Sequence, residues 1–167
     1  MRNKLLLGIP GCIILIFFDQ LTKYLAMVYL KGVTGGINII ENILKIQYLE
    51  NHGAAFGLLQ NKTVFFYIFT ILFLLLFSYL YLRMPTDRKY LPINILLVFF
   101  ISGAIGNLID RIRFQYVIDF IYISLINFPI FNVADIYVTC SCIVFLFLMI
   151  FYYKEEDLNK INFFGKK

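Results

Sequence analysis

The sequence predicts an all-α integral membrane protein, with four transmembrane helices and a small extracytoplasmic β segment between the first two helices. Of its 167 residues, 61% are hydrophobic and 15% are charged, and the mean hydropathy is +0.82. A water-soluble globule rarely has so apolar a composition. Four long apolar runs account for the helices, and one alternating segment accounts for the β structure. We expect a single membrane-embedded domain over residues 1–167.

Each apolar run is long enough to cross a bilayer, which takes about 20 helical residues. We expect the spans at residues 5–30, 63–82, 91–109 and 133–153. Arg2 and Lys4 precede the first run, as in a signal peptide. The run has no small-x-small cleavage site, however, and it is longer than a signal-peptide core. We therefore expect it to remain in the protein as a span.

The connection between the first two spans, residues 31–62, is long and rich in glycine near its start. From Leu44 to Tyr48, apolar and polar residues alternate. This alternation predicts a short strand or hairpin at the outer membrane surface. The last connection, residues 110–132, is rich in apolar and aromatic residues, and we expect it to dip into the membrane interface.

The distribution of basic residues predicts the orientation, because short cytoplasmic loops collect lysine and arginine. With the N-terminus inside, the cytoplasmic set is Arg2, Lys4, Arg83, Arg88, Lys89, Lys154, Lys160, Lys166 and Lys167. The outer set is Lys31, Lys45, Lys62, Arg111 and Arg113, and Lys23 lies within a span. We therefore expect both termini, the polar turn 83–90 and the tail 154–167 in the cytoplasm, with loops 31–62 and 110–132 outside.

Several functions are excluded or disfavoured by what the chain lacks. Its basic residues are scattered or stand at the ends of apolar runs, so we expect no nucleic-acid partner. His52 is the only histidine, and all three cysteines lie inside apolar runs: Cys12, Cys140 and Cys142. We therefore expect no metal, no cofactor and no disulfide framework. A zinc protease and a G-x-S-x-G serine protease are excluded for want of their motifs, and a cysteine protease is disfavoured.

The polar residues near the span ends gather at one membrane level. They are Asp19 and Lys23 in the first run, Asn107, Asp110 and Arg111 at the end of the third, and Asp135 at the start of the fourth. Asp19 lies roughly 20 Å along the first helix. Lys23 follows one turn later on the same face, which favours an ion pair. Because successive helices alternate in direction, the whole group reaches the outer level, and ionisable residues in a span are usually functional.

Two carboxylates, Asp119 in the second outer loop and Asp135, have no obvious local basic partner. If the loop folds back, they face each other, and two close carboxylates share one proton near neutral pH. Such a pair suits general acid and general base catalysis on one water molecule, as in aspartic proteases. The two residues alone equally allow a helix N-cap at Asp135 and a solvated Asp119.

Five motifs in order resemble those of the lipoprotein signal peptidase family, also called signal peptidase II, over nearly the whole chain. They are Asp19-Gln20-Leu21-Thr22-Lys23, Asn51-His52-Gly53-Ala54-Ala55-Phe56-Gly57, Gly103-Ala104-Ile105-Gly106-Asn107-Leu108-Ile109-Asp110-Arg111, Val117-Ile118-Asp119-Phe120, and Phe128-Pro129-Ile130-Phe131-Asn132-Val133-Ala134-Asp135. The resemblance implies an aspartyl peptidase with Asp119 and Asp135 as its catalytic pair. His52 is assigned no role.

The resemblance also implies the substrate and its surroundings. The substrate would be a bacterial prolipoprotein carrying diacylglycerol on a cysteine, cleaved just before that cysteine in the cytoplasmic membrane, near its outer face. The residues that would bind substrate or support the site are Asp19, Lys23, Asn51, Gly53, Asn107, Arg111 and Asn132. Membrane lipids would be the other partners, and the enzyme is expected to act as a monomer.

A small polytopic transporter or proton-conducting subunit is the alternative, with Asp19, Asp110 and Asp135 relaying protons. Such a relay would spread its acids through the membrane depth, whereas these collect at one side. A non-enzymatic membrane scaffold would leave the polar cluster without a purpose.

Overall fold

The computed structural model describes residues 2–53 and 63–161. Its four long helices are α1 (Arg2–Leu30), α2 (Thr63–Arg83), α3 (Leu91–Phe114) and α4 (Val133–Phe151). All four are long and apolar enough to cross a membrane, with mean hydropathies between 1.9 and 2.3. The predicted four-helix membrane class is confirmed. The third apolar run, however, stays helical for five residues beyond Ile109, so Asp110 and Arg111 belong to α3 and not to a loop.

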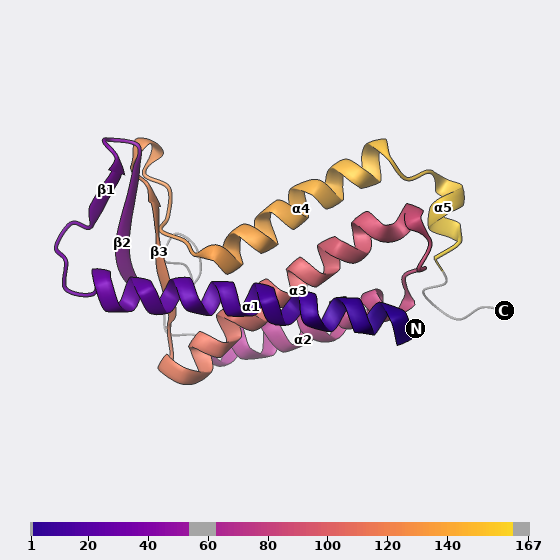
Figure 1. The fold of residues 1–167 in the computed structure, drawn as a ribbon, viewed down its shortest axis with the longest axis horizontal. Helices are drawn as coiled ribbons and strands as arrows, with labels where there is room; N and C mark the ends of the chain where they lie inside the picture. The colour runs from indigo at the N-terminus through magenta and orange to yellow at the C-terminus, as the bar shows by residue number, and fades with distance from the viewer. Residues whose placement is uncertain (1, 54–62, 162–167) are drawn as a thin grey trace.

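Helix α3 is central and packs against α1, α2 and α4 (Figure 1). Two glycines on α3 allow this close approach. A Cβ atom on Gly103 would lie 2.7 Å from the carbonyl oxygen of Ala134 on α4, and one on Gly106 would collide with the carboxylate of Asp19 on α1. Small residues at helix contacts permit such packing where no hydrophobic driving force acts between the helices.

An antiparallel sheet stands at one end of the helices (Figure 1). Its strands are β1 (Ile37–Ile40), β2 (Leu44–Asn51) and β3 (Val117–Ile123), in the order β1-β2-β3. The strand or hairpin predicted for this connection is present as the hairpin of β1 and β2. Strand β3 was not predicted, because the apolar and aromatic residues of the second connection indicated only a segment in the membrane interface. Gln115, in a left-handed conformation with φ of 68°, ends α3 and turns the chain into β3.

The sheet is fixed to α1 by a small apolar core. Its buried members are Ala26, Leu30, Ile118 and Phe120. Strand β3 pairs with β2 so that Asp119 lies opposite Leu49, and Val117 lies opposite Asn51. The strands of the two connections thus form one unit, which we call the sheet end of the molecule.

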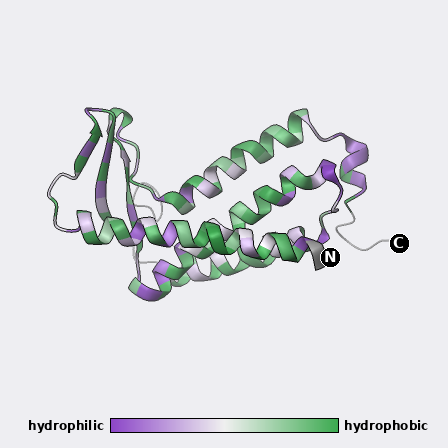
Figure 2. Ribbon diagram, in the orientation of Figure 1, coloured by the Kyte–Doolittle hydropathy of each residue, from purple (hydrophilic) through white to green (hydrophobic). Residues whose placement is uncertain are grey.

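Hydropathy follows this division (Figure 2). Apolar residues run along the four long helices, while hydrophilic residues concentrate at the sheet end and in α5 (Glu155–Asn159).

Short 3-10 turns lie in the connection between α2 and α3, as η2 (Arg88–Tyr90), and in the connection between α3 and α4, as η3 (Ser124–Ile126). At the end away from the sheet, a second apolar core consists of Tyr81, Met84, Tyr90, Ile93, Leu97, Tyr153 and Ile161. Outside α5, the hydrophilic side chains that could form a site therefore lie mainly at the sheet end.

Candidate active site

The candidate site lies where the sheet meets α1, α3 and α4. Helix α4 begins there with a capping box: the backbone N–H of Asp135 donates to Asn132 Oδ1 at 3.0 Å, and the N–H of Asn132 donates to Asp135 Oδ2 at 3.1 Å. The N-cap is therefore Asn132, and the alternative of an N-cap at Asp135 is wrong. The capping box fixes the carboxylate of Asp135 at the start of α4.

Asn132 also connects the two aspartates. Because its Oδ1 accepts from the backbone of Asp135, its Nδ2 is free to donate, and it does so to Asp119 Oδ1 at 2.7 Å. Asn51 at the end of β2 donates to the other oxygen, Asp119 Oδ2, also at 2.7 Å. The carboxylate of Asp119 is thus held on both oxygens, beside Asp135.

Asn107 on α3 orients the second aspartate. Its Oδ1 accepts from the ammonium of Lys23 at 2.9 Å and from Asn132 Nδ2 at 3.0 Å, so its Nδ2 must face the other way. That Nδ2 donates to Asp135 Oδ1 at 2.8 Å. A chain of hydrogen bonds therefore runs from Lys23 through Asn107 to Asp135, and the cation at its start selects the orientation of the amide.

Behind the two aspartates lies a buried ion cluster. Lys23 Nζ is 2.9 Å from Asp19 Oδ2 and 3.0 Å from Asp110 Oδ2, and all three side chains are at most 2% exposed. The two carboxylates also accept backbone hydrogen bonds: Ala134 N donates to Asp19 Oδ1, and Ile118 N donates to Asp110 Oδ2. The predicted ion pair between Asp19 and Lys23 is present. The cluster ties α1 and α3 to β3 and α4.

Two members of this cluster were not among the predicted site residues, namely Asp110 and Gln20. The Nε2 of Gln20 lies 2.9 Å from Asp110 Oδ1 and 3.3 Å from Asp19 Oδ2. From the sequence, Asp110 was predicted to lie in the polar group at the outer membrane level, but it was not assigned to the site. Gln20 offered no comparable signal, because an uncharged residue beside an acid is common.

Asp119 has an environment that favours its protonated form. It is only 2% exposed, so the alternative of a solvated Asp119 is wrong. Burial first, and then the charge of Asp135, raise the pKa of Asp119 to about 7. Hydrogen bonds from Asn51 and Asn132 stabilise the carboxylate and oppose this shift, but they do not cancel it.

A cavity of about 630 Å³ opens in front of the aspartates, between α2, α3 and α4. Its apolar wall includes Phe66, Phe69 and Phe73 of α2, and both aspartates and Arg111 contribute to its polar end. The guanidinium of Arg111 lies 4.7 Å from the ring centre of Phe66, and it makes long contacts, of 3.5 Å, to the carbonyl oxygens of Asn107 and Gly53. The cavity thus suits a substrate with hydrocarbon parts and a polar backbone.

All nine predicted site residues meet in this region: Asp19, Lys23, Asn51, Gly53, Asn107, Arg111, Asn132, Asp119 and Asp135. Of the second motif, residues 54–57 lie outside the described residues. His52 packs edge-on against Tyr116, with ring centres 5.3 Å apart. No group of three or more histidine, cysteine or carboxylate side chains with metal-binding geometry occurs in residues 2–53 and 63–161.

Comparison with known proteins gives consistent matches. The sequence model described as signal peptidase (SPase) II matches residues 12–151. A lipoprotein signal peptidase of Caldanaerobacter subterraneus subsp. tengcongensis is 44% identical over 81% of this chain and 90% of its own length. A lipoprotein signal peptidase of Clostridium tetani is 40% identical over 90% of this chain and 94% of its own length. A bacterial membrane enzyme solved by the in meso method at 2.3 Å resolution has a TM-score of 0.77 at 32% identity, covering 89% of this chain and 92% of that one.

The four-helix fold and these matches define a membrane-embedded peptidase. More particularly, the chain belongs to the signal peptidase II family. It is a protease of the bacterial membrane that removes signal peptides from prolipoproteins. The alternative of a transporter or proton-conducting subunit finds no support in these matches.

Proposed function

We propose that Asp119 and Asp135 are the catalytic pair of an aspartic endopeptidase. The observation that carries this proposal is the pair of bonds made by Asn132, which holds one carboxylate through its Nδ2 and the other through the capping box. Both aspartates line the same cavity. A raised pKa in such a cavity is typical of a catalytic acid.

In the proposed reaction, one aspartate is a carboxylate and the other holds a proton. The carboxylate takes a proton from water, and the resulting hydroxide adds to the carbonyl carbon of the scissile peptide bond. The protonated aspartate donates to the carbonyl oxygen, which gives a tetrahedral diol. The aspartate that took the proton from water then gives it to the peptide nitrogen, and the C–N bond breaks. The other aspartate takes back one hydroxyl proton from the diol, which leaves a carboxyl group and an amine and restores the pair.

The remaining site residues have supporting roles in this proposal. Asn51, Asn107 and Asn132 orient the two aspartates through the bonds described above. Asp19 and Lys23 brace the helices behind them. Arg111 and Gly53 flank the cavity. Arg111 would donate to backbone carbonyls of an extended signal peptide, while Gly53 supports Asn51 by donating its N–H to Asn51 Oδ1. Because one chain supplies every one of these groups, the proposed active unit is a monomer.

The proposed substrate is a prolipoprotein carrying diacylglycerol on the cysteine that follows the cleaved bond. The aromatic wall of the cavity provides an apolar surface for a lipid-bearing residue beside the aspartates. A site open to hydrocarbon also avoids moving acyl chains into water, which costs about 0.8 kcal/mol per CH₂ group. Lipids of the surrounding membrane would be in contact with the same opening.

The test compares a diacylglyceryl-modified prolipoprotein with the same precursor lacking the lipid. We expect cleavage of the modified precursor just before its cysteine, with kcat/KM at least about 100-fold higher than for the unmodified one, as burial of several methylenes would give. Mass spectrometry of the released signal peptide locates the cut. Equal rates for both precursors would remove lipid recognition from the proposal and leave the peptidase assignment in place.

The pH dependence of cleavage follows from Asp119. Its proton is held below pH about 7 and lost above it. Since the pair needs one proton, we expect kcat/KM to fall about tenfold per pH unit on the alkaline side of pH 7. The Asn51→Leu change removes a bond that lowers the pKa of Asp119, so the alkaline limb should move to higher pH. A profile that is flat from pH 6 to 9, or a limb that Asn51→Leu leaves in place, would argue against the assignment.

The proposed orientation has both termini in the cytoplasm and the sheet end outside. It rests on the excess of lysine and arginine at the end away from the sheet. Thr34 and Thr86 are a matched pair of exposed residues, one before β1 and one between α2 and α3. In a background without the native cysteines, we expect Thr34→Cys in intact cells to react with a membrane-impermeant maleimide, and Thr86→Cys to react only after lysis. The opposite pattern would reverse the orientation.

A further inference from the structure

Exposed apolar side chains gather at one end of the sheet, where the turn between β1 and β2 meets η3. Four of them are between 42% and 65% exposed: Ile40, Ile43, Leu125 and Ile126. The carbonyl oxygen of Ile43 accepts from Ser124 N at 2.9 Å and from Leu125 N at 3.4 Å, so the turn and η3 lie side by side. We call residues 40–43 and 124–126 the sheet tip. An exposed apolar patch usually marks a contact with a membrane or with another protein.

The sheet tip is separate from the candidate active site. None of its four apolar side chains lines the cavity at the aspartates. The sheet packs against α1 through Ile118 and Phe120, in the first half of β3, whereas the tip lies at the opposite end of that strand. Figure 1 shows that the strands run across the direction of the helices and that the tip projects beyond them. The tip therefore points along the plane of the membrane.

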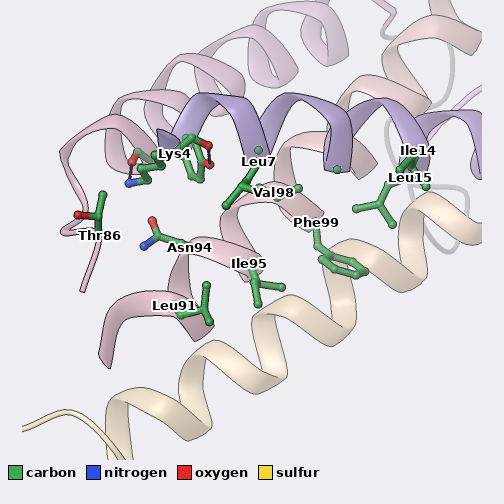
Figure 3. Close-up of a pocket in the computed structure, with 13 residues that line it drawn as sticks. Lys4, Leu7, Ile14, Leu15, Thr86, Leu91, Asn94, Ile95, Val98 and Phe99 are labelled. Atoms are coloured by element: carbon green, nitrogen blue, oxygen red, sulfur yellow. Dashed lines mark hydrogen bonds between the residues drawn. The ribbon is translucent and has the colours of Figure 1, made fainter. Parts of the chain in front are cut away.

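One edge of the hydrocarbon region can be placed on α1 at the end away from the sheet. There the ammonium of Lys4 donates to the carbonyl oxygens of Tyr81 and Met84 at the end of α2 (Figure 3). Arg83 stands in the last turn of the same helix. Basic residues at the ends of spans mark the boundary of the hydrocarbon. The hydrocarbon region of α1 therefore begins close to Lys4.

The other edge follows from the helical rise. A hydrocarbon core of about 30 Å takes about 20 residues at about 1.5 Å each, which leads from Lys4 to Tyr24. Tyr24 is 57% exposed and Tyr29 69%, and tyrosine is enriched where a span meets the headgroups. The same stretch of α1 holds the sheet, through Ala26 and Leu30. The sheet and its tip thus lie at the level of the membrane interface.

We propose that the sheet tip binds the lipid surface of the leaflet at the sheet end, with its four apolar side chains inserted between headgroups and acyl chains. Glu41 and Asn42, in the turn, are exposed and remain among the headgroups, which limits the insertion to the interface. Within the turn, Ile43 N donates to the carbonyl oxygen of Ile40 at 3.1 Å. Such internal bonds lower the cost of bringing the backbone of the turn into lipid.

Strand β3 connects the tip to the candidate site. Asp119 lies within β3, and Ser124 of the tip directly follows its last residue, Ile123. A tip held at the interface therefore keeps Asp119 at a fixed membrane depth, a consequence that rests on the proposed function. The lipid contact itself can be tested without any substrate.

Tryptophan fluorescence tests the contact, because the chain has no tryptophan of its own. Ile126→Trp places a single indole at the tip, and Val33→Trp is the matched control. Val33 is an aliphatic residue 41% exposed in the connection between α1 and β1, on the side of the sheet away from α2, α3 and α4 (Figure 1). Both proteins are reconstituted into phosphatidylcholine vesicles, with or without lipids brominated near the start of the acyl chains. Iodide on both sides of the membrane is the second quencher.

We expect the brominated lipids to quench Ile126→Trp on the order of twofold and Val33→Trp hardly at all, with the reverse order for iodide. If Ile126→Trp were as open to iodide as Val33→Trp, the proposal would be overturned. Protection of Ile126→Trp from both quenchers would show that a protein, such as a second copy of this chain, covers the tip, and would overturn it as well.

Charged substitutions complete the test. Adding Ile40→Glu and Leu125→Glu to Ile126→Trp should abolish the quenching by brominated lipid, because two carboxylates resist transfer into the interface. Adding Val33→Glu to Ile126→Trp is the control and should leave the quenching unchanged. Cleavage of prolipoprotein in detergent shows that each variant is folded. Quenching by lipid that persists with both glutamates in place would contradict insertion of the tip.

Discussion

Replacing Asp119 by asparagine is expected to lower kcat for prolipoprotein cleavage by roughly 10³- to 10⁴-fold, the range for loss of a general acid or base. Asp135→Asn should have an effect of similar size. Because the two residues act on one water molecule in the proposed mechanism, the double variant should lose little more than the worse single variant. The measurement is single-turnover cleavage of a diacylglyceryl-modified precursor.

The fold should survive these changes. Both oxygens of Asp119 accept amide hydrogens, so an asparagine at position 119 loses one hydrogen bond, but the cost of burying a charge is removed as well. Glu50→Gln is the matched control, since Glu50 is another carboxylate of the same sheet, paired with Lys31. That control should cleave at the normal rate. Substantial activity in either single aspartate variant would show that the pair is not catalytic.

Replacing Lys23 by methionine is expected to destabilise the protein by about 3 to 5 kcal/mol. The change leaves the carboxylates of Asp19 and Asp110 buried against each other with their cation removed. It also removes one of the two donors to Asn107 Oδ1, which weakens the hold on the amide that orients Asp135, so cleavage should fall together with stability. The free energy of unfolding, measured by SDS titration in detergent micelles, checks the first effect.

Lys31→Met is the matched control for Lys23→Met. Lys31 also pairs with a carboxylate, at the same distance of 2.9 Å, but its side chain is 55% exposed. Water replaces such a partner at little cost, so no measurable loss of stability is expected. Adding Asp19→Asn to Lys23→Met should restore part of the stability, because one uncompensated charge is removed. Equal effects of the two lysine substitutions would refute the idea that burial makes the cluster essential.

Much of the site could be predicted from single elements of the sequence. Asp19 and Lys23 are four residues apart on an apolar run, and helical geometry alone places them on one face. Asn107 and Arg111 stand at the end of another run, at the same membrane level. For Asp119, local geometry left a carboxylate that faces Asp135 and a solvated carboxylate equally open. The ordered motifs favoured the first.

Strand β3 is the part of the fold that local pattern could not predict. Residues 117–123 form a largely apolar run. Polar and apolar residues do not alternate in it, so the pattern cannot distinguish a strand from a loop in the membrane interface. Their strand conformation depends on pairing with β2, some seventy residues earlier in the chain. That pairing places Asp119 against Asn51, and it exists only once the helices have brought the two connections together.

The sequence by itself determined the membrane class, the four apolar helices and the level at which the polar residues collect. Each of these depends on the hydropathy or the helical rise of one continuous segment and needs no contact between segments. Tertiary structure decided which polar groups bond to which. The amide orientation of Asn107, the double role of Asn132 and the burial of Asp119 each depend on three or more elements meeting at one point. Hydrogen bonds between distant segments carry no signature in either segment alone, so only the folded chain shows how the two aspartates are held.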